Sequence, residues 1–237
     1  MTVFITHAPA PVLNTPYFSK VYGDLLPFDD EYLVRALEMI AFPQRAFHIV
    51  KSWDDHILEV TTPEYPSSVP LYIDSRFGFV GDALPERPSM PSKKVILNRL
   101  MDKVGIPYVW GGNWSQGLSE WIKWYPPPSH LSSLERAHWT LSGLDCSGLL
   151  YEATNGLVPR NTSQLMSYGR EISLEDIKPL DLILFPGHVI IVLNESETIE
   201  SHHKMGGVTI LPLRKRLEMI DRPMTFRRFF QMPQDNA

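Results

Sequence analysis

The order of apolar patterns after a proline-rich segment, "LPERPSMPS" at residues 84–92, limits the fold more than any other feature of the sequence. Ser92 is placed to cap a helix over residues 93–105, and further helices are expected over 144–156 and 161–169. Strands are expected after these helices, at 180–185, 188–193, 197–203, 207–213 and 225–232. Helices followed by strands are typical of an α+β domain.

The part of the chain before this segment has short apolar runs separated by turn residues. They predict strands at 45–51, 56–62, 70–73 and 76–80. Residues 29–40, "DDEYLVRALEMI", place Leu33, Leu37 and Ile40 on one face and therefore predict a helix. We interpret residues 84–92 as a linker and predict two domains: a small β-barrel with a helical insertion at 1–88 and the α+β domain at 89–237.

The composition excludes several classes of protein. The formal net charge of -5 gives no support to a nucleic-acid partner, and a single cysteine excludes an intramolecular disulfide framework. The longest apolar run, "LILFPGHVIIVL", is too short and too interrupted to span a membrane. The N-terminus lacks the pattern of a signal peptide, so we expect a cytoplasmic protein, with export by another route left open.

The single cysteine, Cys146, begins the second predicted helix, in "GLDCSGLLYEATNG". Free N–H groups and the positive end of the helix dipole favour a thiolate at such a position. The alternative is an inert core thiol, because free cysteine is among the most buried residue types. The polar neighbours Asp145 and Ser147 argue against a wholly apolar setting and favour a nucleophile.

A thiol nucleophile requires a base, and His188 is the best candidate because it begins the apolar strand predicted at 188–193. The alternative is a strand-end histidine that only bonds to a turn. A third group should hold the imidazole in one tautomer. Glu200 and His202 on the next predicted strand share a face, since strand side chains alternate, and both are candidates for this role.

Two further features leave alternatives open. Tyr108, in "PYVWGGNW", can either donate its hydroxyl to a developing oxyanion or serve as a core aromatic. A cysteine with two histidines also suggests a metal site, but no close ligand spacing accompanies Cys146. We therefore expect neither a metal nor another cofactor.

Together these residues resemble the NlpC-type cysteine peptidases of bacterial cell-wall metabolism. Five blocks occur in the order of that family, namely "PYVWGG", "GLDCSGLL", "PRNTSQ", "PLDLILF" and "GHVIIVL". The resemblance covers about residues 93–213. It implies a papain-like catalytic domain, often preceded by an SH3-like barrel. The implied reaction is cleavage of peptidoglycan stem peptides, typically between γ-D-glutamate and a diamino acid.

By matched position, the resemblance implies that Cys146 is the nucleophile and His188 the general base. It places four further residues at the substrate site: Tyr108, Asp145, Ser147 and Arg160. Relatives with an SH3-like barrel accept stems with a free L-Ala amino group, so recycling of murein peptides is the expected role. An amidase or acyltransferase that uses the same pair, and a non-catalytic binding module for wall fragments, are the alternatives.

The sequence departs from the family pattern in two places. Relatives usually place a polar residue, often histidine, twelve positions after the base, and here Glu200 occupies that register. A carboxylate orients an imidazole and stabilises its charged form, which favours Glu200 over His202 as the third catalytic residue. Residues 113–142 replace a much shorter loop and carry four tryptophans. This insertion is either a lid, a pocket wall or a dimer contact, or extra packing against the core.

Overall fold

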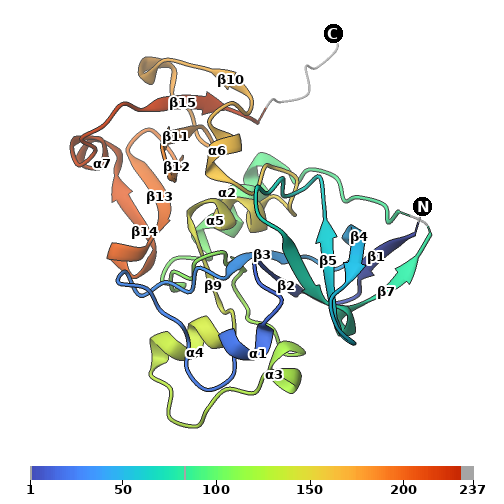
Figure 1. Ribbon diagram of the computed structural model, residues 1–237. Coiled ribbons are helices and arrows are strands. Elements are labelled where there is room, and N and C mark those ends of the chain that lie inside the picture. The colour runs from blue at the N-terminus through green and yellow to red at the C-terminus, as the bar shows by residue number, and fades with distance from the viewer. Residues whose placement is uncertain (1, 83, 231–237) are drawn as a thin grey trace.

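The structure, a computed structural model, describes residues 2–82 and 84–230. Two antiparallel sheets flank the helices α2 (Lys93–Met101) and α5 (Cys146–Ala153), which lie between them in Figure 1. A small third sheet pairs β8 (Asn113–Trp114) with β9 (Gly143–Leu144). Within the described ranges, no helix is long and apolar enough to cross a membrane. The protein therefore has a mixed α and β architecture, as the sequence predicts.

The N-terminal sheet has seven strands in the order β3-β2-β6-β5-β4-β1-β7. Their bounds are β1 (Val3–Thr6), β2 (Ala10–Leu13), β3 (Leu37–Ala41), β4 (Ala46–Ser52), β5 (Ile57–Thr61), β6 (Leu71–Asp74) and β7 (Gly78–Gly81). The predicted strands in this region are confirmed, the last of them beginning only after a short 3-10 turn, η1 (Ser75–Phe77). Because β3 and β7 are the two ends of this order, the sheet is open and is not a closed barrel.

The predicted helix over residues 29–40 is wrong. Residues 29–36 form turns joined by irregular backbone, and the rest of the segment is strand β3. Two features oppose the helix: Asp29 Oδ1 accepts the backbone N–H groups of Glu31 and Leu33, each at 2.9 Å, and Tyr32 has a φ of 57°. Leu37 and Ile40 are buried as residues of β3, and Leu33 is buried in the loop before it, so all three meet the core without a helix. The helix that this region does contain, α1 (Phe18–Val21), is only one turn long.

The C-terminal sheet has six strands in the order β10-β15-β11-β12-β13-β14. Their bounds are β10 (Arg170–Glu171), β11 (Leu182–Phe185), β12 (His188–Val192), β13 (Glu197–His202), β14 (Gly207–Pro212) and β15 (Thr225–Arg228). The predicted strands are confirmed, although residues 231–232 of the last prediction lie outside the described residues. Ser92 accepts the Val95 N–H as the cap of α2, as predicted, and α6 (Thr162–Leu165) and α7 (Leu213–Glu218) complete this half.

The insertion at residues 113–142 forms the helices α3 (Trp121–Trp124) and α4 (Ser133–Trp139). Figure 1 shows both beside α1, at the end of the molecule below α5. Trp121 and Trp139 are completely buried, and the ring of Tyr22 meets both edge-on at centroid distances of 4.8 and 5.9 Å. The indole of Trp121 also donates to the carbonyl of Trp139 at 2.9 Å. Of the open interpretations, extra core packing accounts for these two tryptophans.

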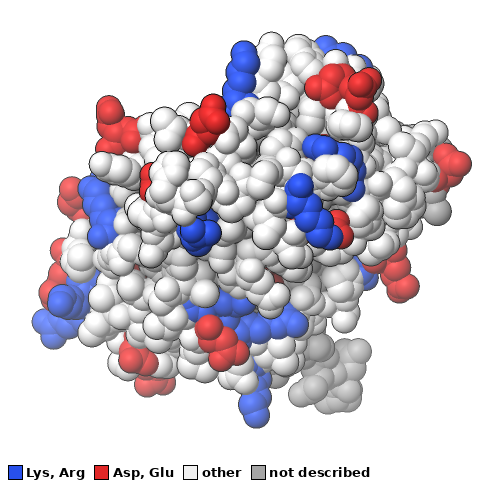
Figure 2. All heavy atoms as spheres, turned by 90° about the horizontal axis from the view of Figure 1, so that it is seen from below, with Lys and Arg blue, Asp and Glu red and all other residues white. Residues whose placement is uncertain are grey.

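One buried apolar cluster runs from the N-terminal sheet through α2 and α5 to the C-terminal sheet, and it includes Ile40, Leu149 and Ile191. Residues 84–92 between the two sheets have no regular secondary structure. The division into domains at residue 88 stays a prediction. On the face seen in Figure 2, acidic and basic side chains are interspersed among uncharged residues.

Candidate active site

Cys146 occupies the first position of α5 and lines a pocket of about 260 Å³. Asp145 caps this helix, because its Oδ1 accepts the backbone N–H of Gly148 at 2.7 Å. A Cβ atom at Gly148 would lie 2.0 Å from the carbonyl oxygen of Gly112, so only glycine lets the helix approach that turn. The "DCSG" sequence thus holds the sulfur at a helix N-terminus, beside N–H groups that the helix itself cannot use.

Asp145 is also bound by a buried arginine. Arg160 donates from Nη1 to Asp145 Oδ1 at 3.0 Å and from Nη2 to Oδ2 at 2.6 Å. Its Nη1 also donates to Ser147 Oγ at 2.9 Å. Burial lowers the pKa of Arg160, but the attraction of Asp145 outweighs it and leaves the pKa raised. The negative charge of Asp145 is therefore balanced inside the protein.

His188 begins β12, directly after Gly187, and is hydrogen-bonded to Glu200 on β13. The His188 Nε2 and Glu200 Oε2 atoms lie 2.5 Å apart. Burial by itself lowers the pKa of His188, but hydrogen bonds to Cys146 and Glu200 raise it to about 9. Because Glu200 holds Nε2, the other ring nitrogen, Nδ1, is the one that can exchange a proton with the thiol.

Glu200 is held in turn by Arg216 of α7, and both side chains are buried. Arg216 donates from Nε to Oε1 and from Nη2 to Oε2, the latter at 3.0 Å. Burial raises the pKa of Glu200, but the bonds from His188 and Arg216 outweigh it and lower the pKa. Sequence reasoning missed Arg216, which follows Glu200 by sixteen residues in a run of basic residues with no distinctive spacing.

His202 lies beside this chain of bonds without joining it. Its ring centroid is 4.9 Å from that of His188, and its Nδ1 accepts the Lys204 N–H at 3.2 Å. Burial and the neighbouring His188 charge lower its pKa to about 4, so its imidazole is neutral near pH 7. Of the two candidates for the third catalytic residue, the structure places Glu200 against the base.

A metal ion is the other ligand that these residues suggest. Ligand atoms of His188, Glu200 and His202 lie within 4.8 Å of one another. However, both oxygens of Glu200 already accept bonds from Arg216, and one of them also meets His188. A metal would have to displace these bonds and lie beside a guanidinium charge, so the arrangement suits a proton relay better than a cation.

The pocket above Cys146 is lined from both parts of the chain. Tyr108 and Trp110 come from the turn before β8, while Glu38 and Tyr65 come from the N-terminal part. Burial and the charges of Asp145 and Cys146 raise the pKa of Tyr108, which keeps its hydroxyl protonated as a donor. Sequence reasoning missed Glu38, which lies on β3, and Tyr65, which lies on the loop after β5, because only the tertiary fold brings them to the cysteine.

Glu38 differs from Asp145 because its partners are neutral. It accepts hydrogen bonds from the Asn14 amide at 2.7 Å and from the Tyr65 hydroxyl at 2.6 Å. Burial and this bond to Glu38 raise the pKa of Tyr65, so the hydroxyl stays a donor. Asp145 is paired with Arg160, whereas within residues 2–82 and 84–230 no basic side-chain nitrogen lies within 4.0 Å of the Glu38 carboxylate in the same pocket lining.

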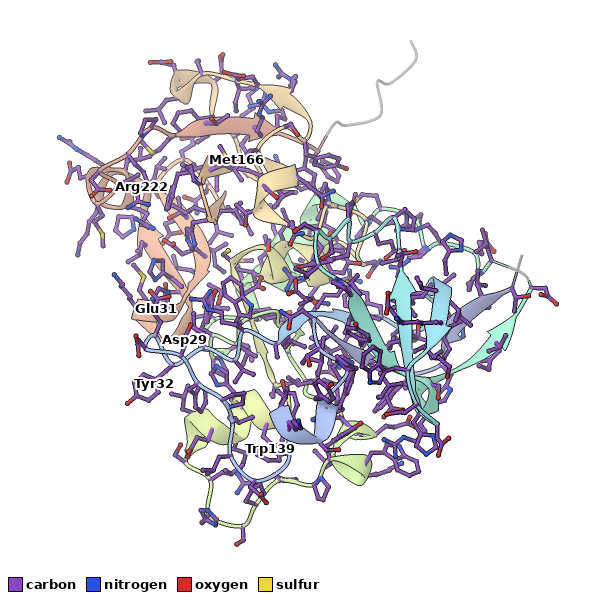
Figure 3. All side chains as sticks on the ribbon, viewed as in Figure 1. Asp29, Glu31, Tyr32, Trp139, Met166 and Arg222 are labelled. Carbon is purple, nitrogen blue, oxygen red and sulfur yellow. The ribbon has the colours of Figure 1, made fainter. Side chains whose placement is uncertain are left out.

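The loop that replaces the predicted helix lies next to this pocket. Figure 3 shows Asp29, Glu31 and Tyr32 on a loop that passes the lower end of β14. Glu31 and His203 come within 3.8 Å, and the Arg35 guanidinium lies 4.1 Å from the centroid of the Trp110 ring. The N-terminal part of the chain therefore closes one side of the pocket.

Comparison with known proteins gives a family match for the half of the chain that carries Cys146 and His188. The sequence model of the NlpC/P60 family matches residues 105–225, just over half of the chain. The peptidoglycan endopeptidase RipB of Mycobacterium tuberculosis is 30% identical over 139 residues, which are 56% of this chain and 52% of RipB. The peptidoglycan endopeptidase RipA of Mycolicibacterium smegmatis is 24% identical over 58% of this chain and 26% of RipA.

A solved structure of the peptidoglycan hydrolase RipB from Mycobacterium tuberculosis superimposes with a TM-score of 0.44 at 27% identity. The superposition covers 59% of this chain and 65% of that structure. The chain thus spans about half the length of the RipB sequence that it matches and about a quarter of RipA.

Proposed function

Because the chain belongs to the NlpC/P60 family, we propose that it is a cysteine endopeptidase that hydrolyses peptidoglycan stem peptides. The observation that carries the proposal is the arrangement of three side chains. The Cys146 Sγ lies 3.9 Å from the carbonyl oxygen of Gly187, the residue directly before His188, and His188 is hydrogen-bonded to Glu200. A nucleophile, a base and a group that orients the base are the parts that acyl transfer through a thiol requires. The names of the matched relatives, both peptidoglycan endopeptidases, supply the substrate class.

The proposed reaction has two steps. The Cys146 thiolate attacks the γ-carbonyl carbon of D-glutamate, and His188 gives its Nδ1 proton to the leaving amine of the diamino acid. Water then attacks the thioester carbonyl, and His188 accepts a proton from the water. The Cys146 sulfur leaves as thiolate, which releases the γ-D-glutamyl product and restores the Cys146 thiolate beside a protonated His188. The first-turn N–H of Cys146 and the Tyr108 hydroxyl are the donors that we assign to the oxyanion.

We further propose that Glu38 selects stems whose L-Ala amino group is free. A carboxylate without a cationic partner attracts an ammonium group more strongly than a paired one. Asp145 is paired with Arg160, whereas the partners of Glu38 among the described residues, Asn14 and Tyr65, are neutral. We assign Ser147 and Arg160 the role of holding the Asp145 cap. In this proposal the N-terminal part, which we expect to be SH3-like, closes the amino-terminal end of the groove and limits the substrate to soluble fragments. The recycling of murein peptides in the cytoplasm is the role that we propose.

Hydrolysis of L-Ala-γ-D-Glu-diaminopimelate, followed by mass spectrometry, tests the reaction. We expect L-Ala-γ-D-Glu and free diaminopimelate as products, and no turnover by Cys146→Ala. Turnover by Cys146→Ala at the wild-type rate would overturn the nucleophile. Product that retains an added amine would instead indicate an acyltransferase, and a thiol that resists alkylation near neutral pH would favour the non-catalytic binding module.

The free amino group is tested with the same peptide acetylated at its N-terminus. We expect wild-type protein to lose about 10- to 100-fold in kcat/KM on acetylation, because a charge-assisted bond is lost. Glu38→Gln should lower cleavage of the free stem by a similar factor and leave cleavage of the acetylated stem almost unchanged. Glu195→Gln, at an exposed position away from the pocket, is the matched control. Equal cleavage of both peptides by the wild-type protein would contradict this selectivity.

A further inference from the structure

A second cavity, of about 430 Å³, lies at the opposite end of α5 from Cys146 and is larger than the pocket at the cysteine. It lies between the turn after β3, the helix α2 and the residues that end α5. Its walls carry three cations and two carboxylates, from Arg45, Arg99, Lys103, Glu86 and Glu152. The proposed hydrolysis uses none of these residues.

Two guanidinium groups converge on Asn155, just beyond the end of α5. Arg45 donates from Nη2 to the Asn155 carbonyl at 2.6 Å. Arg99 donates from Nη1 to the Asn155 side-chain oxygen at 2.9 Å and to the carbonyl of Ala153 at 3.0 Å. These bonds satisfy carbonyl groups at a helix C-terminus, which is a structural role. They use only part of the five N–H donors that each guanidinium carries.

The two guanidinium groups differ in how far a carboxylate compensates their charge. In the part of the chain that the structure describes, Arg99 has no carboxylate within 4.0 Å. Arg45 is 5% exposed, its Nε donates no hydrogen bond there, and the nearest carboxylate oxygen, on Glu64, is 3.6 Å away. Lys103 and Glu152 offset each other at 3.2 Å. Arg99 is half-buried and lacks a carboxylate partner, so an anion that entered the cavity would gain a charge-assisted bond from its guanidinium.

Apart from Gln44 and Asn155, the remaining lining is apolar. Phe42 and Trp114 meet edge-on with centroids 5.3 Å apart, and Pro43 and Pro88 complete the wall. Cavities of this volume, with an apolar wall and a few convergent charged groups, are typical of small-molecule sites. We propose that this cavity is a second binding site, for a small molecule that carries a carboxylate or phosphate group on an apolar body.

Titration calorimetry on the full chain, with benzoate and with inorganic phosphate as separate probes at constant ionic strength, tests the site. We expect saturable binding of benzoate, at least tenfold weaker in Arg99→Gln, which removes the charge but keeps amide donors. The matched control is Lys94→Gln, which removes one positive charge from an exposed position of the same helix. Tighter binding of phosphate than of benzoate would assign the site to phosphate esters.

Two results would overturn the proposal: no saturable binding of either probe, or equal binding by Arg99→Gln and wild type. Arg99→Lys keeps the charge and should keep most of the affinity, which separates loss of the charge from loss of the fold. The same titrations on protein alkylated at Cys146 should give unchanged binding, because that pocket is at the other end of α5. Stem-peptide hydrolysis by Arg99→Gln should equal that of wild type, so the two proposals fail or succeed separately.

Discussion

Two buried carboxylate–arginine pairs support the two reactive side chains, and they do so differently. Asp145 and Arg160 lie beside Cys146 in the pocket lining, and their other bonds go to the Gly148 N–H at the helix cap, to Ser147 and to Asn113. Glu200 and Arg216 lie behind His188, and their bonds end on a ring that titrates. The first ion pair therefore fixes the position of Cys146 at the start of α5. The second ion pair instead affects the charge of the His188 ring. Substitutions in the first pair should affect stability, and substitutions in the second should affect the pH dependence.

The largest effect is expected from Asp145→Asn. This change leaves Arg160 as a buried charge without its counter-ion and should lower the free energy of unfolding by about 3–5 kcal/mol. Urea denaturation followed by circular dichroism measures it. Asp29→Asn, which breaks an exposed pair with Arg35, is the control and should have a far smaller effect. Equal losses in the two variants would show that the buried pair is not a structural support.

The next effect concerns catalysis. Glu200→Gln removes the charge that helps to raise the pKa of His188 to about 9, and should lower kcat/KM by about 10²- to 10⁴-fold. The fall of activity at high pH, which follows loss of the imidazole proton, should move to lower pH than in the wild type. A pH profile of kcat/KM from 5 to about 10 tests this. An unchanged profile would mean that Glu200 does not set the charge of the base.

The same pKa affects stability. The folded protein holds the His188 proton up to about pH 9, against 6.5 for an ordinary histidine. The stability contribution is therefore complete below about pH 6.5 and is lost as the pH rises through about 9. Glu200→Gln should weaken this pH dependence in urea denaturation measured across that range.

The sequence allows prediction of the parts that depend on local patterns. Helix α2 has its serine cap, and α5 begins where Asp145 caps it. The strands of the C-terminal sheet are continuous apolar runs separated by turns, so their positions along the chain can be predicted from the sequence. Cys146 and His188 stand at the ends of such elements, which is why each could be identified as a candidate without the structure.

The features that the sequence does not reveal depend on contacts between distant residues. Glu38 joins the pocket only because β3 lies at the edge of a sheet, in a segment whose spacing suggests a helix. Arg216 reaches Glu200 from a helix that carries other basic residues with similar spacing. The two arginines at Asn155 come from positions 45 and 99, more than fifty residues apart in the chain.

A smaller effect is expected from Arg216→Met. Without the guanidinium, the pKa of Glu200 should rise, because one of the two groups that lower it is gone. Glu200 then gains a proton sooner as the pH falls, so the acid side of the kcat/KM profile should move to higher pH. Arg216→Lys keeps the charge and should shift the acid side of the profile less. Arg214→Met, at an exposed position of the same helix, should leave the profile unshifted. A shift of equal size in Arg214→Met would rule out a specific role for Arg216.

The smallest effect is expected from His202→Asn, which separates the two candidates for the third catalytic residue. The pKa of His202 is lowered to about 4, so the side chain is neutral over the working range and contributes no charge to His188. Its ring packs against His188 without a hydrogen bond to it, so kcat/KM should fall by less than about tenfold with the profile unmoved. A loss as large as that of Glu200→Gln, with a shift on the basic side, would assign the orienting role to His202 instead. The comparison is informative because β13 carries both residues on one face, two positions apart.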